Sequence, residues 1–246
     1  MMNKPKIIGV IPARYQSSRF PGKPLAEICG KPMIWWVYQQ VIKVPEFAEV
    51  YVATDDDRIK AVCDSYAMKV LMTKNNHPEH ISRVHEVSVA VAADMYVCVN
   101  GDEPLISPDC ISSVIQSTLK KEDFFFSGAM RKLTDPAETI DPANIKIVMS
   151  QTGRCLYMSR TPVPFPKGTL LFNYFKYVGI ECFSKQALDF FVNAEQGSLE
   201  KVEDIDHLRF LENYKELSFT LVDSESISVD TPKDLEKVVL LIQQKH

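Results

Sequence analysis

Apolar residues in the first half of the chain follow two alternating patterns. Short runs rich in Val and Ile predict strands, and longer segments with apolar residues at helical spacing predict helices. We expect strands at residues 6–11, 49–54, 69–72 and 95–100, and helices at residues 33–44, 57–66, 83–92 and 108–120. Such an alternation favours a mostly parallel sheet covered by helices on both faces.

The second half of the chain has a less regular pattern. It predicts strands at residues 124–130, 145–149, 155–159, 177–183, 218–222 and 226–229, and helices at residues 205–214 and 232–243. Three prolines between residues 161 and 168 exclude a regular element there. We therefore predict a single α/β domain over residues 1–246, with an irregular insertion at about residues 131–200.

Composition narrows the class of protein. The 28 basic and 32 acidic residues give a net charge of -4 and form no long block of one sign, which argues against a nucleic-acid partner or a membrane partner. The chain lacks an apolar run of the roughly 20 residues that span a bilayer. The six cysteines are scattered singly, and the first residues carry no apolar signal segment. These features are typical of reduced thiols, so we expect a cytoplasmic protein.

Polar clusters follow the predicted parallel strands. Residues 12–23 follow the first strand, residues 55–57 the second, and residues 101–103 the fourth. Ligands of such sheets bind outside the carboxyl ends of the strands, near the switch in strand order. We therefore expect these clusters to form one binding site.

The loop after the first strand carries three cations among turn-forming residues. Arg14 and Arg19 can form forked hydrogen bonds to phosphate oxygens, and Lys23 supplies a mobile point charge. Small residues in the loop let backbone N–H groups approach the same oxygens. The loop is thus a candidate site for a triphosphate, although an ordinary solvated loop with three exposed cations has the same composition.

Seven short motifs occur in order from the first strand to the last helix. They are Ile11-Pro12-Ala13-Arg14, Arg19-Phe20-Pro21-Gly22-Lys23-Pro24-Leu25, Gly30-Lys31-Pro32-Met33-Ile34, Val52-Ala53-Thr54-Asp55, Gly101-Asp102-Glu103-Pro104, Ser159-Arg160 and Val229-Asp230-Thr231-Pro232. Together they resemble the signature of the 3-deoxy-manno-octulosonate cytidylyltransferases, also called CMP-KDO synthetases. The resemblance implies a Rossmann-like, GT-A-like nucleotidyltransferase fold with a mixed, mostly parallel sheet, and a homodimer formed through the insertion.

The resemblance also implies a reaction and a set of site residues. CTP and a 3-deoxy sugar acid would give a CMP-sugar and pyrophosphate, for lipopolysaccharide or capsule assembly. The residues implied at the nucleotide are Pro12, Ala13, Arg14, Arg19, Lys23, Asp55, Arg83 and Asp102. Among them Arg14, Lys23 and Asp102 would be catalytic, with Arg14 and Lys23 stabilising the leaving pyrophosphate.

Two aspartates are the candidate metal ligands. Mg²⁺ prefers hard oxygen ligands and usually takes one or two carboxylates, which leaves positions for phosphate oxygens. Asp102 follows a predicted strand, and Asp230 closes another before Thr231-Pro232. From the residues alone, an N-cap role explains Asp230 equally well, but the matching family positions are metal ligands. We therefore expect a Mg²⁺ site at Asp102 and Asp230.

The chain departs from the family pattern in the segment that holds the base. The family has Ser-Gly-Thr-Glu/Asp-Arg where this chain has Glu79-His80-Ile81-Ser82-Arg83. The exchange removes a flexible backbone position and a hydroxyl donor, so base selectivity is less well defined, with CTP as the default. His77, His80 and His85 have no zinc-site spacing, and we expect them to be solvated loop residues.

The acceptor positions depart further. The family's Gln is Asn100 here, its His and Tyr on one strand are Tyr177 and Glu181, and its Glu-Gln pair is Asp206-His207, whereas Arg160 is retained near the expected sugar carboxylate. The expected acceptor-binding residues are thus Asn100, Arg160, Tyr177, Glu181, Asp206 and His207. We hypothesise a changed acceptor, for example one with an amine that faces Glu181 or Asp206.

Three hypotheses follow from these departures. The chain is an octulosonate cytidylyltransferase that tolerates a changed pocket, a paralogue that activates another acid-bearing acceptor, or a non-catalytic nucleotide-binding regulator. The regulator is disfavoured because Arg14, Lys23, Asp102 and Asp230 are all present.

Overall fold

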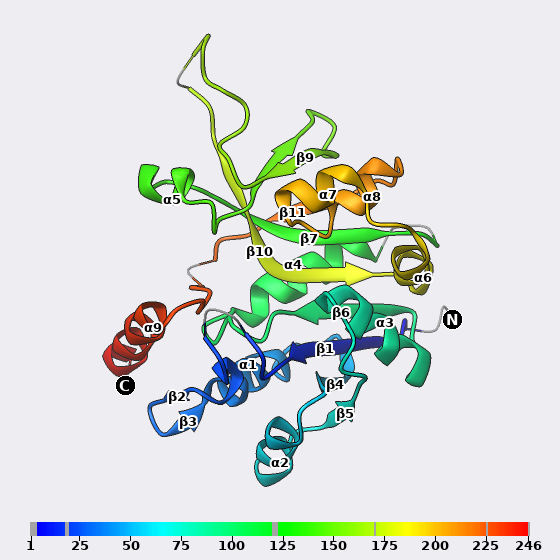
Figure 1. Cartoon of the computed structure of the whole chain (residues 1–246), viewed down its shortest axis with the longest axis vertical. Coiled ribbons are helices and arrows are strands. Elements are labelled where there is room, and N and C mark those ends of the chain that lie inside the picture. The colour runs from blue at the N-terminus through cyan, green and yellow to red at the C-terminus, as the bar shows by residue number, and fades with distance from the viewer. Residues whose placement is uncertain (1–3, 18–19, 120–122, 170, 225, 246) are drawn as a thin grey trace.

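A mixed sheet forms the centre of the molecule. The computed structural model describes residues 4–17, 20–119, 123–169, 171–224 and 226–245. Its central strands lie in the order β11-β7-β10-β6-β1-β4-β5 (Figure 1). Their bounds are β1 Ile7–Ala13, β4 Phe47–Thr54, β5 Val70–Met72, β6 Met95–Val99, β7 Phe126–Lys132, β10 Phe175–Phe183 and β11 Ser218–Leu221. The predicted α/β class with a mostly parallel sheet is confirmed.

One strand runs against the others. β1, β4, β5 and β6 are parallel, and β7 is parallel to β11, whereas β10 is antiparallel to both β6 and β7. The first residues of β10 therefore lie at the same edge of the sheet as the carboxyl ends of the parallel strands. This reversal brings β10 side chains to the edge where ligands bind.

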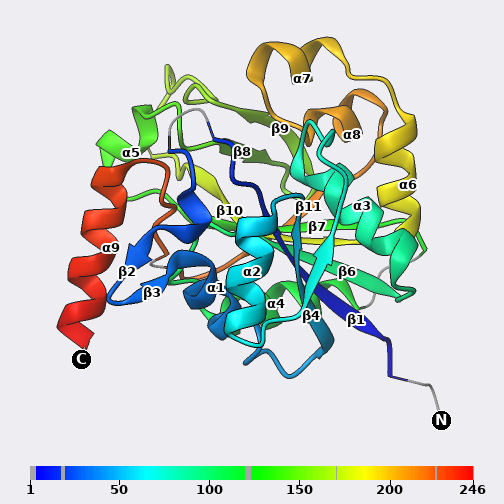
Figure 2. The same ribbon diagram turned by 60° about the horizontal axis from the view of Figure 1, so that its bottom comes forward.

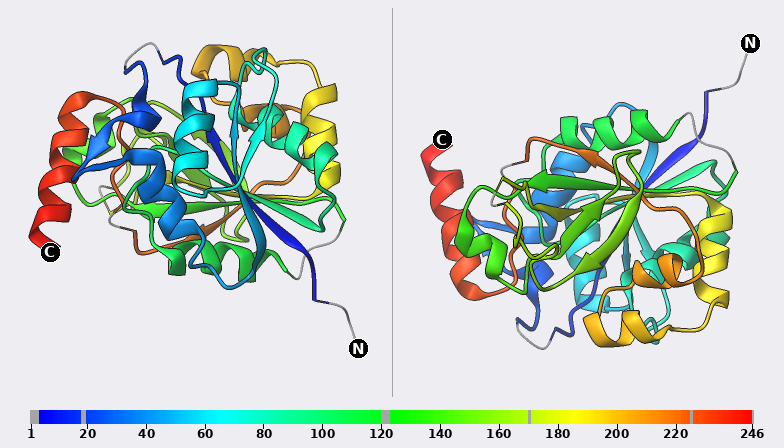
Figure 3. Two further views of the ribbon diagram at one scale, coloured as in Figure 1. Left: turned by 90° about the horizontal axis from the view of Figure 1, so that it is seen from below. Right: turned by 90° about the horizontal axis from the view of Figure 1, so that it is seen from above.

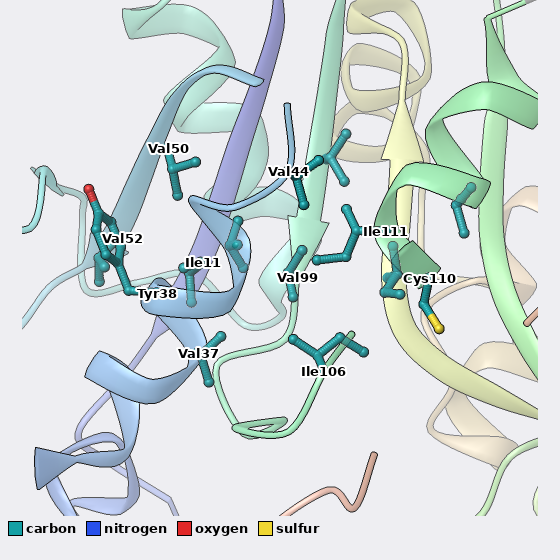
Figure 4. Close-up of a cluster of buried hydrophobic side chains, with 14 of the residues drawn as sticks. Ile11, Val37, Tyr38, Val44, Val50, Val52, Val99, Ile106, Cys110 and Ile111 are labelled. Atoms are coloured by element: carbon teal, nitrogen blue, oxygen red, sulfur yellow. The ribbon is translucent and has the colours of Figure 1, made fainter. Parts of the chain in front are cut away.

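Helices cover both faces of the sheet (Figures 2 and 3). One face packs against α1 (Met33–Val41), α2 (Asp57–Ser65) and α4 (Pro108–Thr118), and this apolar cluster includes Ile11, Val52, Val99 and Ile111 (Figure 4). The other face packs against α3 (His80–Ala90), α6 (Lys185–Asn193) and α8 (Leu208–Glu212). Burial of apolar side chains on both faces makes the strand ends a rigid support for a site.

Smaller elements surround this core. β8 (Lys146–Met149) and β9 (Cys155–Ser159) form a ribbon that pairs with the start of β10, and α5 (Pro136–Ile140) lies beside it. The short 3₁₀ helix η1 (Lys23–Leu25) precedes a second ribbon of β2 (Glu27–Ile28) and β3 (Lys31–Pro32), and α9 (Pro232–Lys245) packs on this ribbon and α1. α7 (Ser198–Glu203) precedes α8.

Several sequence predictions need correction. β10 and α6 belong to the core, although both lie within residues 131–200, where the sequence predicted an irregular insertion. The helix expected at 205–214 covers only Leu208–Glu212, and α5, α6 and α7 were not predicted. No strand forms at 226–229 among the described residues, because the N–H of Val229 donates to Asp102 O at 2.8 Å instead of to a sheet partner.

Two further observations concern the cysteines and the helices. All six cysteines are free thiols, and only Cys29 is exposed. Of the helices that the structure describes, none combines the length and the apolar character needed to cross a bilayer.

Candidate active site

Two cavities meet at the carboxyl edge of the sheet. The smaller has a volume of 380 Å³ and the larger 1310 Å³. Asn100, Asp102 and Asp230 line both. A molecule in one cavity would therefore touch a molecule in the other beside the two aspartates.

The end of β1 and the cationic loop form one wall of the smaller cavity. Pro12, Ala13, Arg14 and Lys23 line it, as the sequence predicted for a nucleotide site. The end of β6 approaches this wall closely, since a Cβ at Gly101 would lie 2.8 Å from the carbonyl oxygen of Pro12. Glycine at 101 therefore allows the chain after β6 to reach the phosphate loop. Arg19 lies outside the described residues.

Lys23 joins the two candidate metal ligands. Its Nζ donates to Asp102 Oδ2 at 2.7 Å and to Asp230 Oδ1 at 3.4 Å. The segment before Asp230 is fixed by the hydrogen bond from Val229 N to Asp102 O. The predicted pair is thus brought together around one cationic group.

The aspartate pair fits a hard divalent cation. Within the described residues, Asp102 Oδ1 is buried without a hydrogen-bond partner, while Oδ2 is bound to Lys23. A buried carboxylate oxygen is costly unless a donor or a cation satisfies it. Oxygen ligands are those Mg²⁺ prefers, so Asp102 and Asp230 are suited to hold the ion that the sequence predicted.

Arg83 and Asp55 have different positions in the site. Arg83 lines the smaller cavity, is almost fully buried, and donates to Thr73 Oγ1. Asp55 lines neither cavity and forms an ion pair with Arg83, with 3.3 Å between Oδ1 and Nη2. Asp55 thus pairs with Arg83 and lies outside the cavity, whereas the sequence expected it to bind nucleotide directly.

Arg160 lines the larger cavity from the end of β9. Its Nε donates to Glu203 O at 2.6 Å, Nη2 to Asp204 O at 2.8 Å and Nη1 to Pro142 O at 3.2 Å. A guanidinium has five N–H groups, so these three bonds orient the side chain and leave one N–H on each of Nη1 and Nη2, with the Asp204 carboxylate 3.6 Å from Nη2. This geometry suits recognition of a carboxylate.

Sequence reasoning missed several charged residues of the larger cavity, among them Glu103, Arg131 and Lys176. Glu103 is buried and accepts from Gly179 N at 2.8 Å, and burial together with Asp102 raises the pKa of its carboxyl. Burial and the neighbouring Arg131 lower the pKa of Lys176. Glu103 belongs to the Gly-Asp-Glu-Pro motif, so the motif could have identified it as a site residue from the sequence. Arg131 and Lys176 meet only through the pairing register of β7 and β10.

A hydrogen-bonded cluster lies between the two cavities. Glu181 is fully buried; its Oε2 lies 2.8 Å from His80 Nε2, and its Oε1 lies 2.5 Å from His207 Nε2 and accepts from the Tyr177 hydroxyl at 2.7 Å. His80 Nδ1 is 3.4 Å from Asp206 Oδ2. We call these five residues the Glu181 network.

The network corrects part of the expected acceptor site. Tyr177 lines the larger cavity, and Asp206 and His80 line the smaller one. Glu181 and His207 line neither cavity and are buried behind these walls. In this structure Glu181 and His207 are thus separated from both cavities, whereas the sequence expected them to contact the acceptor directly.

Charges within the network are matched. Burial by itself would raise the pKa of Glu181, but His80 and His207 outweigh it and hold that pKa well below its usual range. Burial opposes protonation of His80, yet Glu181 and Asp206 raise its pKa to about 9. Burial, followed by Glu181, raises the pKa of Tyr177 far above its usual value. The network thus contains a carboxylate and an imidazolium at neutral pH.

The three neighbouring histidines are not solvated loop residues as expected. His80 belongs to the network, His77 Nε2 lies 2.5 Å from Glu86 Oε2, and His85 Nε2 lies 2.9 Å from Asp189 Oδ1. Each ring is fixed by a carboxylate that comes from the fold of α3 and its neighbours.

The chain has the fold of nucleotidyltransferases. A putative glucose-1-phosphate thymidylyltransferase from Bacillus anthracis has the same fold, with a TM-score of 0.69 at 12% identity over 96% of this chain and 94% of that one. The sequence model of the cytidylyltransferase family matches residues 8–217. The chain belongs to the cytidylyltransferase family, which confirms the family predicted from its motifs.

Individual relatives resemble the chain over nearly its whole length. The 3-deoxy-manno-octulosonate cytidylyltransferase of Escherichia coli is 35% identical, covering 98% of this chain and 97% of the relative. An 8-amino-3,8-dideoxy-manno-octulosonate cytidylyltransferase of Shewanella sp. (strain W3-18-1) is also 35% identical, covering 94% and 96%. A solved structure of CMP:2-keto-3-deoxy-manno-octonic acid synthetase complexed with CTP has a TM-score of 0.93 at 35% identity, covering 98% of this chain and 100% of that one.

Proposed function

We propose that the protein transfers the cytidylyl group of CTP to 3-deoxy-manno-octulosonate or a close relative, and releases pyrophosphate. The observation that carries the proposal is the meeting of two cavities at Asp102 and Asp230, with Lys23 between them. The product would serve the assembly of lipopolysaccharide or a capsule. The full-length similarity to octulosonate cytidylyltransferases supports this choice.

The smaller cavity is the proposed nucleotide site. Arg14 and Lys23 line it and would neutralise the charge that develops on the departing pyrophosphate. Arg83, fixed by Asp55, lines the same cavity beside the segment that replaces the family's base-binding motif. This arrangement separates the phosphate end of the site from the base end.

Asp102 and Asp230 are the proposed holders of Mg²⁺. When bound, the ion would supply positive charge beside the α-phosphate. Lys23 already balances one oxygen of each carboxylate, so it would also keep the pair correctly spaced.

The larger cavity is the proposed acceptor site. The two remaining N–H groups of Arg160 would bind the acceptor carboxylate and orient its attacking hydroxyl toward the shared boundary at Asn100 and Asp102. A covalent enzyme intermediate is unnecessary, because alignment of two bound reactants lowers the barrier of an in-line displacement.

An amine-bearing acceptor is the second candidate. Three related proteins are 8-amino-3,8-dideoxy-manno-octulosonate cytidylyltransferases at 35–36% identity. Of the two carboxylates that the sequence suggested for an ammonium group, Glu181 is buried, and Asp206 lines the smaller cavity proposed for the nucleotide. Because His80 already neighbours Asp206, its negative charge is partly compensated. This pairing favours the unmodified sugar acid.

A matrix of nucleotides and acceptors tests the proposal. Pyrophosphate release is measured with CTP, UTP, ATP and GTP against 3-deoxy-manno-octulosonate, its 8-amino analogue and shorter 3-deoxy sugar acids, each with Mg²⁺. We expect the fastest turnover with CTP and the unmodified octulosonate. Faster turnover of the amino analogue would select the second candidate, and a lack of turnover with every pair would favour the non-catalytic regulator.

Two further properties stay predictions. A homodimer formed through the insertion at about residues 131–200 is tested by sedimentation of the purified protein. A cytoplasmic location, expected from the single cysteines, is tested by fractionation of the source cells.

A further inference from the structure

Five of the departures from the family pattern form one connected unit. His80, Tyr177, Glu181, Asp206 and His207 are among the positions at which the sequence departs from the resemblance, and all five belong to the Glu181 network. They come from the start of α3, from β10 and from the segment before α8. These segments are far apart in the sequence but meet around one buried carboxylate. We therefore expect the five residues to share one role.

We propose that Glu181 is a positioning residue that fixes the facing walls of both cavities and thereby couples binding of nucleotide and acceptor. The inference rests on the proposed function, since it assigns the two cavities to the two substrates. Glu181 itself does not touch substrate, because it lines neither cavity.

One arm of the network reaches the acceptor side. The Tyr177 hydroxyl donates to Glu181 Oε1 at 2.7 Å, which holds the ring as part of the wall of the larger cavity. Without the carboxylate the hydroxyl would lose a partner at a buried site and the ring would reorient. The contact between Tyr177 and Glu181 therefore determines the shape of the wall that the acceptor would contact in the larger cavity.

The other arm reaches the nucleotide side. His80 lies at the first residue of α3 and lines the smaller cavity, with its two ring nitrogens directed to Glu181 and Asp206. Asp206 lines the same cavity. Glu181 therefore fixes the ring of His80, and His80 in turn neighbours the cavity carboxylate of Asp206.

The buried carboxylate is held from a third side. His207 Nε2 lies 2.5 Å from Glu181 Oε1, and the His207 ring packs edge-on against Phe126 in the core. A carboxylate bonded to three partners in an apolar core has one orientation, because moving it would break charged hydrogen bonds. Glu181 can therefore transmit a displacement of one wall to the other.

Three variants separate the arms. We expect Glu181→Gln to raise the KM for both CTP and acceptor at least about tenfold, the lower range for a lost charged hydrogen bond, while kcat changes less. Tyr177→Phe should raise mainly the KM for acceptor, and His80→Gln mainly the KM for CTP. A purely structural role would instead lower the amount of active enzyme and leave both KM values unchanged.

Glu212→Gln is the matched control. The Glu212 carboxylate accepts from Leu199 N at 3.0 Å and Glu200 N at 3.2 Å at the start of α7 and lines neither cavity. Its loss should lower the thermal stability without changing either KM. Unchanged KM values in Glu181→Gln, at a stability equal to that of the control, would overturn the proposal.

A metal ion is the competing explanation for the cluster. The ligand atoms of His80, Cys98 and Glu181 lie within 4.8 Å of one another. We expect elemental analysis of the purified protein to find no stoichiometric zinc. One equivalent of zinc in the wild type that is lost in Glu181→Gln would overturn the proposal, since the carboxylate would then be a metal ligand.

Calorimetry with CTP alone distinguishes failure of the inference from failure of the proposed function. If the wild type turns over no acceptor, the proposed function fails, but CTP binding still tests the nucleotide arm. Glu181→Gln and His80→Gln should both weaken CTP binding, whereas Tyr177→Phe should not. If all three variants bound CTP with the affinity of the wild type, the inference would be overturned.

Discussion

Lys23 Nζ lies 2.7 Å from Asp102 Oδ2, although the two residues are 79 positions apart in the sequence. The lysine comes from the phosphate loop and the aspartate from the turn after β6. Their contact means that the group that would meet the leaving pyrophosphate is fixed by a group that would hold the metal. Loss of either should therefore affect chemistry far more than folding.

Removing one charge from the aspartate pair tests this relationship. Asp102→Asn and Asp230→Asn should each slow pyrophosphate release by about 10²- to 10³-fold, because each weakens the charge stabilisation at the reacting phosphate. Thermal unfolding should change little, since both side chains are partly exposed. Asp64→Asn, which removes a surface pair with Lys60, is the control. Near-normal rates in both variants would contradict the metal assignment.

Arg160 should act on the acceptor alone. Arg160→Lys keeps the positive charge but loses the two-pronged hydrogen bonding of the guanidinium group. We therefore expect the KM for acceptor to rise roughly 10- to 100-fold, with the KM for CTP unchanged. Arg154→Lys, at an exposed arginine paired with Glu216, should behave as wild type. Steady-state kinetics with each substrate varied separately checks the prediction. An equal effect on both KM values would argue against a carboxylate contact.

The pair of His80 and Glu181 should make stability depend on pH. The pKa of His80 rises from 6.5 to about 9 on folding, so its stabilising effect is complete below about pH 6.5 and is lost as the pH rises through 9. Over this range we expect the free energy of unfolding to fall by at most about 3 kcal/mol. Urea unfolding should show this slope in the wild type and in His85→Gln, but not in His80→Gln. An unchanged slope in His80→Gln would assign the effect to other groups.

Gly179 should be intolerant of a side chain. A Cβ there would lie 2.6 Å from Asn100 Nδ2 and 2.7 Å from Glu103 Oε1, at the boundary of the larger cavity. Gly179→Ala should lower stability by about 1–3 kcal/mol through overpacking and should also lower activity. Gly168→Ala, where no atom lies within 4 Å, is the control for chemical denaturation. If the two variants were equally stable, β10 would have to shift at no cost to make room for the added Cβ.

The sequence by itself determined the local elements and the phosphate site. Hydrophobic periodicity located the strands of the parallel half, and two of them, β1 and β6, are apolar runs that are buried along almost their whole length. Arg14 and Asp102 could be singled out because each comes shortly after a strand, and the carboxyl ends of parallel strands meet at one edge whatever the details of packing. Lys23 and Asp230 were singled out by their motifs, and the contacts of Lys23 Nζ with Asp102 and Asp230 bring them to the same edge.

Only the tertiary structure decided the role of the acceptor-side residues. A glutamate in an apolar strand has the same sequence pattern whether it contacts a ligand or is neutralised inside the protein. Glu181 is neutralised by His80, 101 positions away, and by His207, 26 positions away, and such contacts have no local signal. The apolar alternation at 226–229 was misread as a strand for the same reason, because the partner of Val229 N is the turn at Asp102. Long-range partners determine where a polar group lies, and chain folding alone brings them together.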